Sequence, residues 1–466
     1  MKRRREHPIA IPGHIPYYYL LLILPLLRGV WYIRLPDGFP RWLRGTWFDG
    51  GVMAALLVLS AIAWKQRTYD VSPHRLRLCR GIFYHRTTLV PLHWVTTLTV
   101  EQPLWMRPLG AAKVSADTDG GNHKLADLRL TVWRQQAALF LPDAEEGVYL
   151  RAKGWRIWLL CLLSSDSFGG LLLLSAALRQ SSVILGEGIR HKVMNNLENA
   201  ADTLAVIPRT AALLILILAI GWAAGTVRHL LRHLPFTLYC RPDTLTIYMG
   251  RFTRRTHCCA VDAINYLDIR QTLAAHLLKV YTVYINCTGY GKDKNTLAVV
   301  IPPARRIAEE WSLLFPHRKP CTVTLRPAKG AWLRYLRMPL ILLLALPLAG
   351  QLTGWLFPVW RDLTAYLSLL GILPCLWWGA VRVAAGRIAG VGYHNGQYSL
   401  CYPRWLSLHR VTIPREKVAM IHVRQSLWQR RRGVCNLRMY SNHEFRRPHK
   451  VRHLPYKDVQ QLLKEV

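Results

Sequence analysis

The ten-residue segment RQSLWQRRRG, residues 424–433, has an earlier counterpart in EQPLWMRPLG, residues 101–110. Both segments have Gln in second place, Leu in fourth, Trp in fifth and Gly in tenth. A third version, RQTLAAHLLK at residues 270–279, keeps the Gln and the Leu but has Ala for Trp and Lys for Gly. Recurrence of one phrase at wide spacing predicts a domain that occurs three times along the chain.

The residues around each phrase alternate between apolar and polar side chains over short runs, as in RLRLCRG (75–81), TLTIYMG (244–250) and YSLCY (398–402). This alternation predicts half-buried antiparallel strands. Each copy ends on a short apolar stretch and a Pro, at Pro142, Pro302 and Pro455, where we expect a C-terminal helix to begin. The spacing from Gln to Pro is 40, 31 and 30 residues, and a turn-rich insertion explains the longer first value.

Apolar segments long enough to cross a bilayer precede each copy in pairs. They lie at about residues 17–33, 48–64, 156–178, 207–227, 333–357 and 364–384. The sequence therefore predicts an α+β membrane protein with six transmembrane helices in three hairpins, alternating with three β-barrel or curled-sheet domains that each close with a helix. The expected division is a tail and first hairpin at 1–66, domain one at 67–152, a second hairpin with an amphipathic connector at 153–232, domain two at 233–320, a third hairpin at 321–388 and domain three at 389–466.

The third apolar segment contains Asp166, and two interpretations of it stay open. A charge at the bilayer centre costs at least about 2.5–3.5 kcal/mol, which favours a segment that lies at the interface. Three similar domains should share one compartment, which requires an even number of crossings and favours full spanning. If the segment spans, Asp166 is a candidate functional group inside the membrane.

The chain carries 62 Lys and Arg against 26 Asp and Glu, for a formal charge of +36, within a sequence that is 51% hydrophobic. Basic residues interleaved with long apolar runs and 18 Trp indicate an anionic lipid surface as partner, and no nucleic acid. Lys and Arg near the helix ends favour termini and domains in the cytoplasm. Dispersed Cys, His and carboxylates predict no metal, no cofactor and no catalytic cluster.

Candidate headgroup contacts are Arg residues near strand turns, where guanidinium groups can meet phosphate oxygens. They are Arg75, Arg77, Arg80 and Arg86 in copy one; Arg251, Arg254 and Arg255 in copy two; and Arg430, Arg431 and Arg432 in copy three. For any single Arg, nonspecific attraction to an anionic leaflet is favoured over a built site. The repeated Gln102, Gln271 and Gln425 are expected to hydrogen-bond the backbone of the following turn, which is favoured over the alternative of a ligand contact. Trp105 and Trp428 fit equally well against the barrel or in the headgroup layer.

The opening YDVSPHRLRLCRGIFYHRTTLVPLHWV, the glutamine phrase and the Thr-Asp-Gly-Gly turn at 118–121 resemble the bacterial pleckstrin-homology-like, membrane-flanked domains of the YdbS/YdbT type, in their three-domain form. Copy two departs from this pattern where its fourth strand lacks the preceding Pro. The resemblance implies a bacterial inner-membrane location and no established reaction.

Two functions from different classes follow. The first is a non-catalytic, multi-pass membrane protein whose cytoplasmic domains bind anionic lipid headgroups or a protein partner, such as another membrane protein or a second family member. The alternative is a lipid or small-molecule transporter, or a subunit of one. This hypothesis is based on Asp166 and on the Gly- and Ser-rich third segment.

Overall fold

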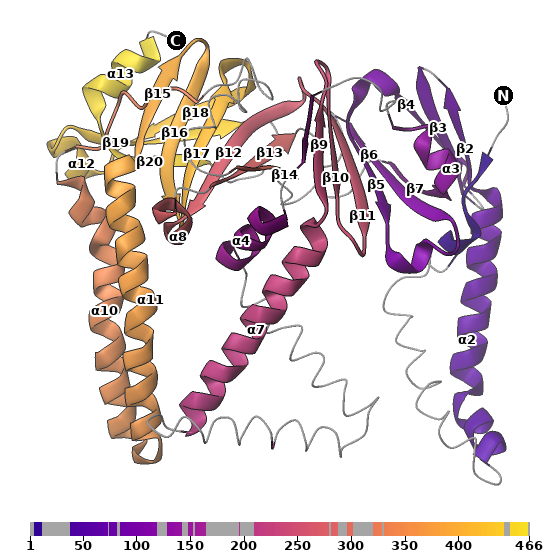
Figure 1. The fold of residues 1–466 in the computed structure, drawn as a ribbon, viewed down its shortest axis with the longest axis horizontal. Helices are drawn as coiled ribbons and strands as arrows, with labels where there is room; N and C mark the ends of the chain where they lie inside the picture. The colour runs from indigo at the N-terminus through magenta and orange to yellow at the C-terminus, as the bar shows by residue number, and fades with distance from the viewer. Residues whose placement is uncertain are drawn as a thin grey trace. The chain divides into compact units, whose positions relative to one another are not determined.

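The computed structural model describes residues 4–11, 38–72, 74–81, 84–118, 128–141, 148–151, 154–164, 195, 209–278, 281–287, 296–301, 320–328, 330–441 and 448–464. The chain forms two compact units (Figure 1). Unit 1 comprises residues 1–145, 253–260 and 289–292, and unit 2 comprises residues 146–252, 261–288 and 293–466.

Unit 1 contains the long helix α2 (Gly38–Gln66) and the strands of copy one. These are β2 (Thr68–Ser72), β3 (Arg75–Arg80), β4 (Arg86–Pro91), β5 (Val95–Gln102), β6 (Ala111–Thr118) and β7 (Leu128–Trp133), with the short helices η5 (Leu92–Trp94), η6 (Leu104–Met106) and α3 (Arg134–Ala138). The N-terminal β1 (Arg4–Arg5) pairs with β2. The predicted alternation places Leu76 and Leu78 in a core with Val114 and Leu130.

Unit 2 contains copy three, copy two apart from its third strand, and the helices that precede these copies. Copy two has β9 (Phe236–Cys240), β10 (Thr244–Met249), β12 (Ile264–Thr272), α8 (Leu273–Leu277), β13 (Tyr281–Cys287) and β14 (Thr296–Ile301), and β8 (Val148–Arg151) pairs with β9. Copy three has β15 (Gly390–His394), β16 (Gln397–Arg404), β17 (Ser407–Pro414), η8 (Arg415–Lys417), β18 (Val418–Arg424), α12 (Leu427–Arg431), β19 (Val434–Ser441) and β20 (His449–Pro455). The helices are α4 (Gly154–Ser164), α7 (Arg209–His233), α10 (Ala331–Leu356), η7 (Pro358–Trp360), α11 (Arg361–Ile388) and α13 (Tyr456–Lys464).

The three copies share details that confirm the repeat. The strand that leads to the glutamine is β5, β12 or β18, and each pairs with the strand after it. Each of these pairings has a register shift at the same place, seven to five residues before the glutamine, at Val95/Thr97, Ile264/Tyr266 and Val418/Met420. A β-bulge of this kind bends a strand and is a built feature of a sheet.

Strands also pair between copies, which the sequence did not predict. In unit 1, β5 of copy one pairs antiparallel with β11 (Arg254–Ala260), the third strand of copy two. In unit 2, β12 of copy two pairs with β17, the third strand of copy three. Gln102 lies opposite Arg254, which is 17 residues before Gln271. Gln271 lies opposite Leu408, which is 17 residues before Gln425. The two junctions therefore use one register.

Two of the described helices, Trp47–Gln66 within α2 and Ala331–Leu356 (α10), are long and apolar enough to cross a membrane. The structure has further long helices in α7 and α11, of 25 and 28 residues, near the predicted segments 207–227 and 364–384. The predicted segment 17–33, the amphipathic connector and Asp166 lie outside the described residues. Of the segment predicted at 156–178, the structure describes the part up to Ser164, which belongs to helix α4 (Gly154–Ser164).

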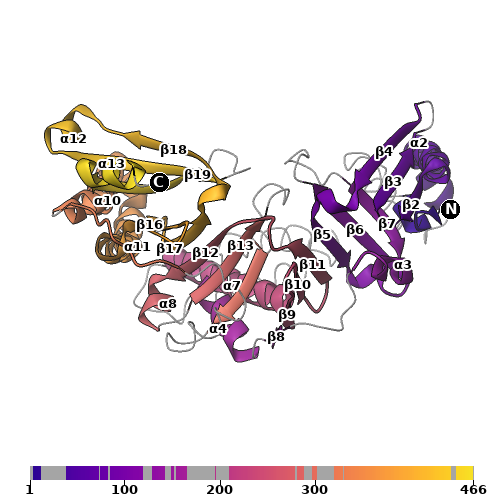
Figure 2. The same cartoon turned by 90° about the horizontal axis from the view of Figure 1, so that it is seen from above.

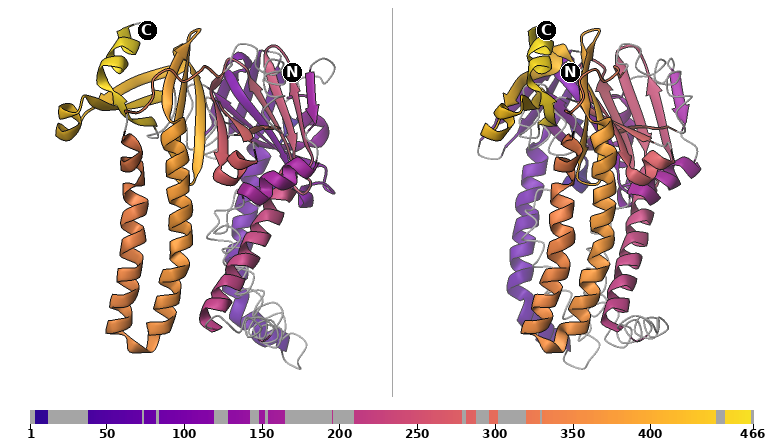
Figure 3. Two further views of the ribbon diagram at one scale, coloured as in Figure 1. Left: turned by 60° about the vertical axis from the view of Figure 1, so that its left-hand side comes forward. Right: turned by 90° about the vertical axis from the view of Figure 1, so that its left-hand side faces the viewer.

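Helices α10 and α11 run side by side (Figure 3). Glycines permit the close approach: a Cβ atom at Gly350 would lie 2.7 Å from the Cβ of Ser368. Small residues at helix–helix contacts are typical of membrane helices.

A C-terminal helix follows Pro455 as predicted, since α13 begins at Tyr456 and buries Val459 and Leu462. The residues directly after Pro142 and Pro302 lie outside the described part of the chain.

Candidate functional site

The repeated glutamine fixes the turn that follows its strand. Gln102 Nε2 donates to the carbonyl of Ala111 at 3.2 Å, and Gln425 Nε2 donates to the carbonyl of Val434 at 3.1 Å. Both acceptors lie nine residues after the glutamine, so the two copies close the turn in the same way. In copy two, Gln271 Oε1 lies 3.3 Å from Nδ1 of His276 within the turn.

The residue after each glutamine starts a short helix. Ser426 caps α12 with a capping box that it shares with Gln429, and Thr272 accepts from the backbone N–H of Ala275 at 3.2 Å in α8. Ser and Thr are favoured at this position because their side chains satisfy backbone N–H groups that the first helical turn leaves open. In copy one, Pro103 precedes η6. We call these three segments the post-glutamine turns: residues 103–110, 272–278 and 426–433.

Each post-glutamine turn presents bulky apolar side chains to solvent. In copy three, 81% of Leu427 and 75% of Trp428 are exposed. The corresponding exposed side chains are Leu104, Trp105 and Leu109 in copy one, and Leu277 and Leu278 in copy two. Apolar side chains that cluster on a tip and stay exposed mark a surface that contacts something else.

The copy-one turn lies beside the end of α2. His7 Nε2 is 3.0 Å from the carbonyl oxygen of Leu109. The neighbouring Glu6 accepts from Trp64 Nε1 through its backbone carbonyl at 2.9 Å, and its carboxylate lies 3.4 Å from Arg67. Residues 6 and 7 therefore connect the turn to the last residues of a helix that is long enough to span a bilayer.

The copy-three turn lies beside the start of α10. Nδ1 of His453 is 3.1 Å from Arg334 Nη1, which lies in the first turn of α10, and 3.3 Å from Gln429 Nε2 in α12. Burial, together with Arg334, Arg452 and further cations, lowers the pKa of His453 to about 4. His453 is therefore neutral at pH 7 and can accept hydrogen bonds through Nδ1.

The copy-two turn packs on the last turns of α11. Leu273 of α8 forms one buried cluster with Val381 and Ala385 of α11 and Leu408 of β17. Each post-glutamine turn thus lies at the end of a long helix where the chain enters or leaves the sheet domain.

Cations accompany the exposed tryptophans. The Lys113 ammonium lies 5.9 Å from the centre of the Trp105 ring, and the Arg431 guanidinium lies 5.7 Å from that of Trp428. Arg430 and Arg432 flank Arg431 and are exposed. An aromatic ring with a cation beside it matches the boundary between acyl chains and anionic headgroups.

A family model described as "Bacterial PH domain" matches residues 19–140, 196–312 and 340–466, which together cover well over half of the chain. The chain belongs to the bacterial PH domain family. Searches of curated proteins and of solved structures find no match. Each matched range begins before the first strand of its copy, so the three copies are three PH domains preceded by helical sequence.

The four candidate arginines of PH domain one fall in two places. Arg80 and Arg86 lie opposite each other at the ends of β3 and β4, and the register places the neighbouring Cys79 beside Thr68, two residues after α2 ends. The pKa of Arg80 is lowered, mainly by burial and then by the positive charges of Arg67 and Arg86. These three cations therefore lie close together. Arg75 pairs with Ser72 and Pro91 at the opposite end of the strands. Arg77 lies between them on β3.

In PH domain two, Arg251 follows β10 and lies beside the last turn of α7, where its backbone N–H donates to the carbonyl of Leu231 at 3.2 Å. Arg254 and Arg255 begin β11, and Nε of Arg255 forms an ion pair with Glu101 of PH domain one at 3.2 Å. In PH domain three, Arg430 and Arg431 belong to α12, and Arg432 ends it.

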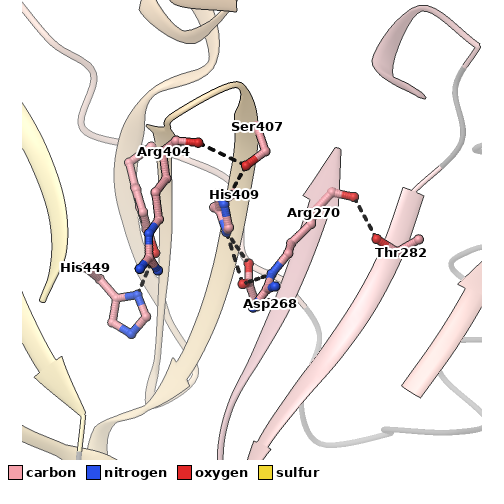
Figure 4. A network of polar contacts seen from close by, with 8 residues as sticks. Asp268, Arg270, Thr282, Arg404, Ser407, His409 and His449 are labelled. Carbon is pink, nitrogen blue, oxygen red and sulfur yellow. Dashed lines mark hydrogen bonds and ion pairs between the residues drawn. The ribbon is translucent and has the colours of Figure 1, made fainter. Parts of the chain in front are cut away.

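A buried polar network at the junction of PH domains two and three was not predicted from the sequence (Figure 4). Asp268 of β12 lies 3.0 Å from His409 Nδ1 of β17, and its Oδ2 atom is 2.6 Å from Arg270 Nε. Burial alone would raise the pKa of Asp268, but His409 and Arg270 outweigh it and hold the pKa well below its usual range. The sequence signal was a lone carboxylate in the middle of an apolar strand, with an Arg two residues later on the same face.

The network continues from His409 Nε2 to the hydroxyl of Ser407 at 2.9 Å, so a serine, a histidine and a carboxylate follow one another. However, the Ser407 hydroxyl donates to the carbonyl of Arg404 at 3.0 Å, which closes the β16–β17 turn. A nucleophilic serine donates its proton to the histidine, whereas the Ser407 hydroxyl donates to a backbone carbonyl. The network therefore joins two PH domains. Among the described residues, no three His, Cys, Asp or Glu side chains gather as they would around a metal ion.

Proposed function

We propose that this chain is a membrane-anchored, non-catalytic binding protein of the bacterial inner membrane. Its three PH domains face the cytoplasm and rest their post-glutamine turns in the headgroup layer of an anionic leaflet. The observation that carries the proposal is that all three turns expose bulky apolar side chains at the ends of long helices.

The physical chemistry of the turns supports lipid as the ligand. Each cation held near an anionic surface contributes about 1 kcal/mol of attraction, so Arg430, Arg431 and Arg432 together would hold α12 firmly against the leaflet. Trp and Leu beside them then bury apolar area among the acyl chains. A second basic group, Arg80 and Arg86 with Arg67, lies near the end of α2, and 91% of Tyr84 in the adjoining turn is exposed.

The test is amide hydrogen exchange of the full-length protein in nanodiscs of phosphatidylglycerol and, separately, of phosphatidylcholine. We expect the amides of residues 427–432 to exchange more slowly in phosphatidylglycerol, because the anionic surface binds α12. A variant with Arg430→Gln, Arg431→Gln and Arg432→Gln should lose this difference between the lipids. A second variant, Leu427→Ser with Trp428→Ser, should reduce protection in both lipids.

The matched control removes cations from the opposite end of strand β18, where η8 precedes it. Arg415→Gln with Lys417→Gln takes two charges from η8 and should leave the exchange of residues 427–432 as in the wild type. Equal exchange of the wild-type turn in the two lipids would overturn the proposal.

A further inference from the structure

Strand β18 of PH domain three is the outermost strand of the sheet β18-β19-β20 (Figure 2). Its counterparts β5 and β12 each have a second strand on this edge, the third strand of the following PH domain. Among the described residues, no strand pairs with this edge of β18. The edge of β18 therefore repeats an interface that the chain fills twice elsewhere.

At both filled junctions, the side chains one, three and five residues before the glutamine face the incoming domain. In β5, Glu101 pairs with Arg255 at 3.2 Å, and Thr99 lies 2.9 Å from His257 Nδ1. In β12, Asp268 bonds His409, and Tyr266 enters the core of PH domain three. The same positions in β18 are Met420, His422 and Arg424, and all three side chains are exposed.

Exposed sheet edges are often protected by a bulge or an inward charge. The bulge of β18 at Val418/Met420 gives no such protection, because β5 and β12 carry the same bulge and still accept a strand. The inner face of β18 carries no inward charge of this kind, since Ile421 and Val423 pack there against the core of their own domain. The outer edge of β18 is thus built to accept a strand.

Charge identifies the occupant. In the shared register, the residue before the glutamine lies opposite the residue 16 positions before the next glutamine, as Glu101 lies opposite Arg255 and Arg270 opposite His409. A second copy of this chain would offer β4, the outer strand of its own sheet, and would place Arg86 opposite Arg424. Like charges directly opposite each other destabilise a strand pair.

We infer that β18 binds, antiparallel and in this register, an edge strand of a different protein chain that places an Asp or Glu opposite Arg424. By continuity with β11 and β17, that strand is the third strand of a PH domain. The inference does not depend on lipid binding, since it concerns a sheet edge rather than the post-glutamine turns.

The test uses two synthetic peptides of residues 407–416, the segment that contains β17, because β17 already occupies this register on β12. One peptide has His409→Glu and the other His409→Arg, so that they differ only opposite Arg424. Binding to the full-length protein in detergent micelles is measured by fluorescence anisotropy. We expect the Glu peptide to bind roughly fivefold more tightly than the Arg peptide, from the change of a repulsive to an attractive cross-strand pair.

Arg424→Glu in the full-length protein should reverse this order, which nonspecific adsorption to micelles would not do. The inference is overturned if neither peptide binds above empty micelles, or if Arg424→Glu leaves the order unchanged. Sedimentation of the wild-type protein supplies the second measurement. Oligomers that dissociate on Met420→Arg would identify a second copy of the chain as the occupant and would also overturn it.

Discussion

His453 shows how one side chain holds a domain to the long helix that precedes it. It lies at φ 60°, accepts from both Arg334 and Gln429 through Nδ1, and donates its backbone N–H to Asn436 Oδ1 at 3.2 Å. Its carbonyl accepts from Ala328, just before α10. Protonation of the ring would remove the acceptor and add a charge beside several cations.

This arrangement predicts a pH dependence of stability in the mildly acidic range. The pKa of His453 falls from an ordinary 6.5 to about 4 in the folded protein. The unfolded state therefore binds the proton more readily, and the stability that the neutral ring contributes is lost as the pH falls from about 6.5 to about 4. His453→Asn, which tolerates the positive φ, should flatten thermal unfolding midpoints over this interval. An unchanged slope would contradict the assignment.

Asp268 predicts a second effect at the residue scale. Asp268→Asn removes the carboxylate charge that compensates Arg270, and breaking a buried pair in this way costs about 3 kcal/mol. The thermal unfolding midpoint of the full-length protein in detergent should fall clearly. Asp262→Asn, at an exposed position of the same copy, is the matched control and should leave the midpoint unchanged. Because the pKa of Asp268 is lowered, its contribution is present above about pH 4 and is lost as the pH falls further, so the variant should lack this acid-sensitive part.

At the scale of elements, the α10–α11 hairpin depends on small residues. A Cβ atom at Gly350 would meet the Ser368 side chain at 2.7 Å and the backbone oxygen of Thr364 at 3.2 Å. Gly350→Ala should therefore push the helices apart and destabilise the protein by about 1–3 kcal/mol, as overpacking does. Gly51→Ala in α2 is the control, since nothing lies within 4 Å of its added Cβ. Equal thermal midpoints for the two variants would refute the packing role of Gly350.

The strands and their order were predictable because alternation directly reports which face of a strand is buried. RLRLCRG became β3, with Leu76 and Leu78 inside and Arg75 exposed. The glutamine phrase located the strand end and the turn in all three copies. What the sequence could not reveal is which edges meet, because β5 and β18 have similar patterns, yet only β5 has β11 on its outer side.

The same limit applied to the candidate site. Composition pointed to Arg430, Arg431, Arg432 and Trp428, which the structure gathers on one short helix beside α10. Sequence spacing also suggested that Arg75, Arg77, Arg80 and Arg86 form one group, but antiparallel pairing places Arg75 at the far end of the strands from Arg80. Arg255 is engaged by Glu101, a partner more than a hundred residues away that spacing alone cannot identify.

At the scale of the whole molecule, PH domains two and three each donate their third strand to the domain before them. Both junctions use one register but different chemistry: an ion pair between Glu101 and Arg255 in one, and the Asp268–His409 contact in the other. Arg255 and His409 occupy equivalent positions on the donated strands, but their partners lie one and three residues before the glutamine. Such differences discourage a domain from joining the wrong neighbour, which is how interfaces gain specificity.

The repeated offset of 17 residues between glutamine and donated strand also bears on how such chains change over evolutionary time. When one PH domain is duplicated or lost together with the helices before it, the donated strand still meets its acceptor strand with the backbone hydrogen bonds aligned. Only a few side chains at the new junction between PH domains then need to change. The length of the series is therefore free to vary, while the geometry of each joint stays constant.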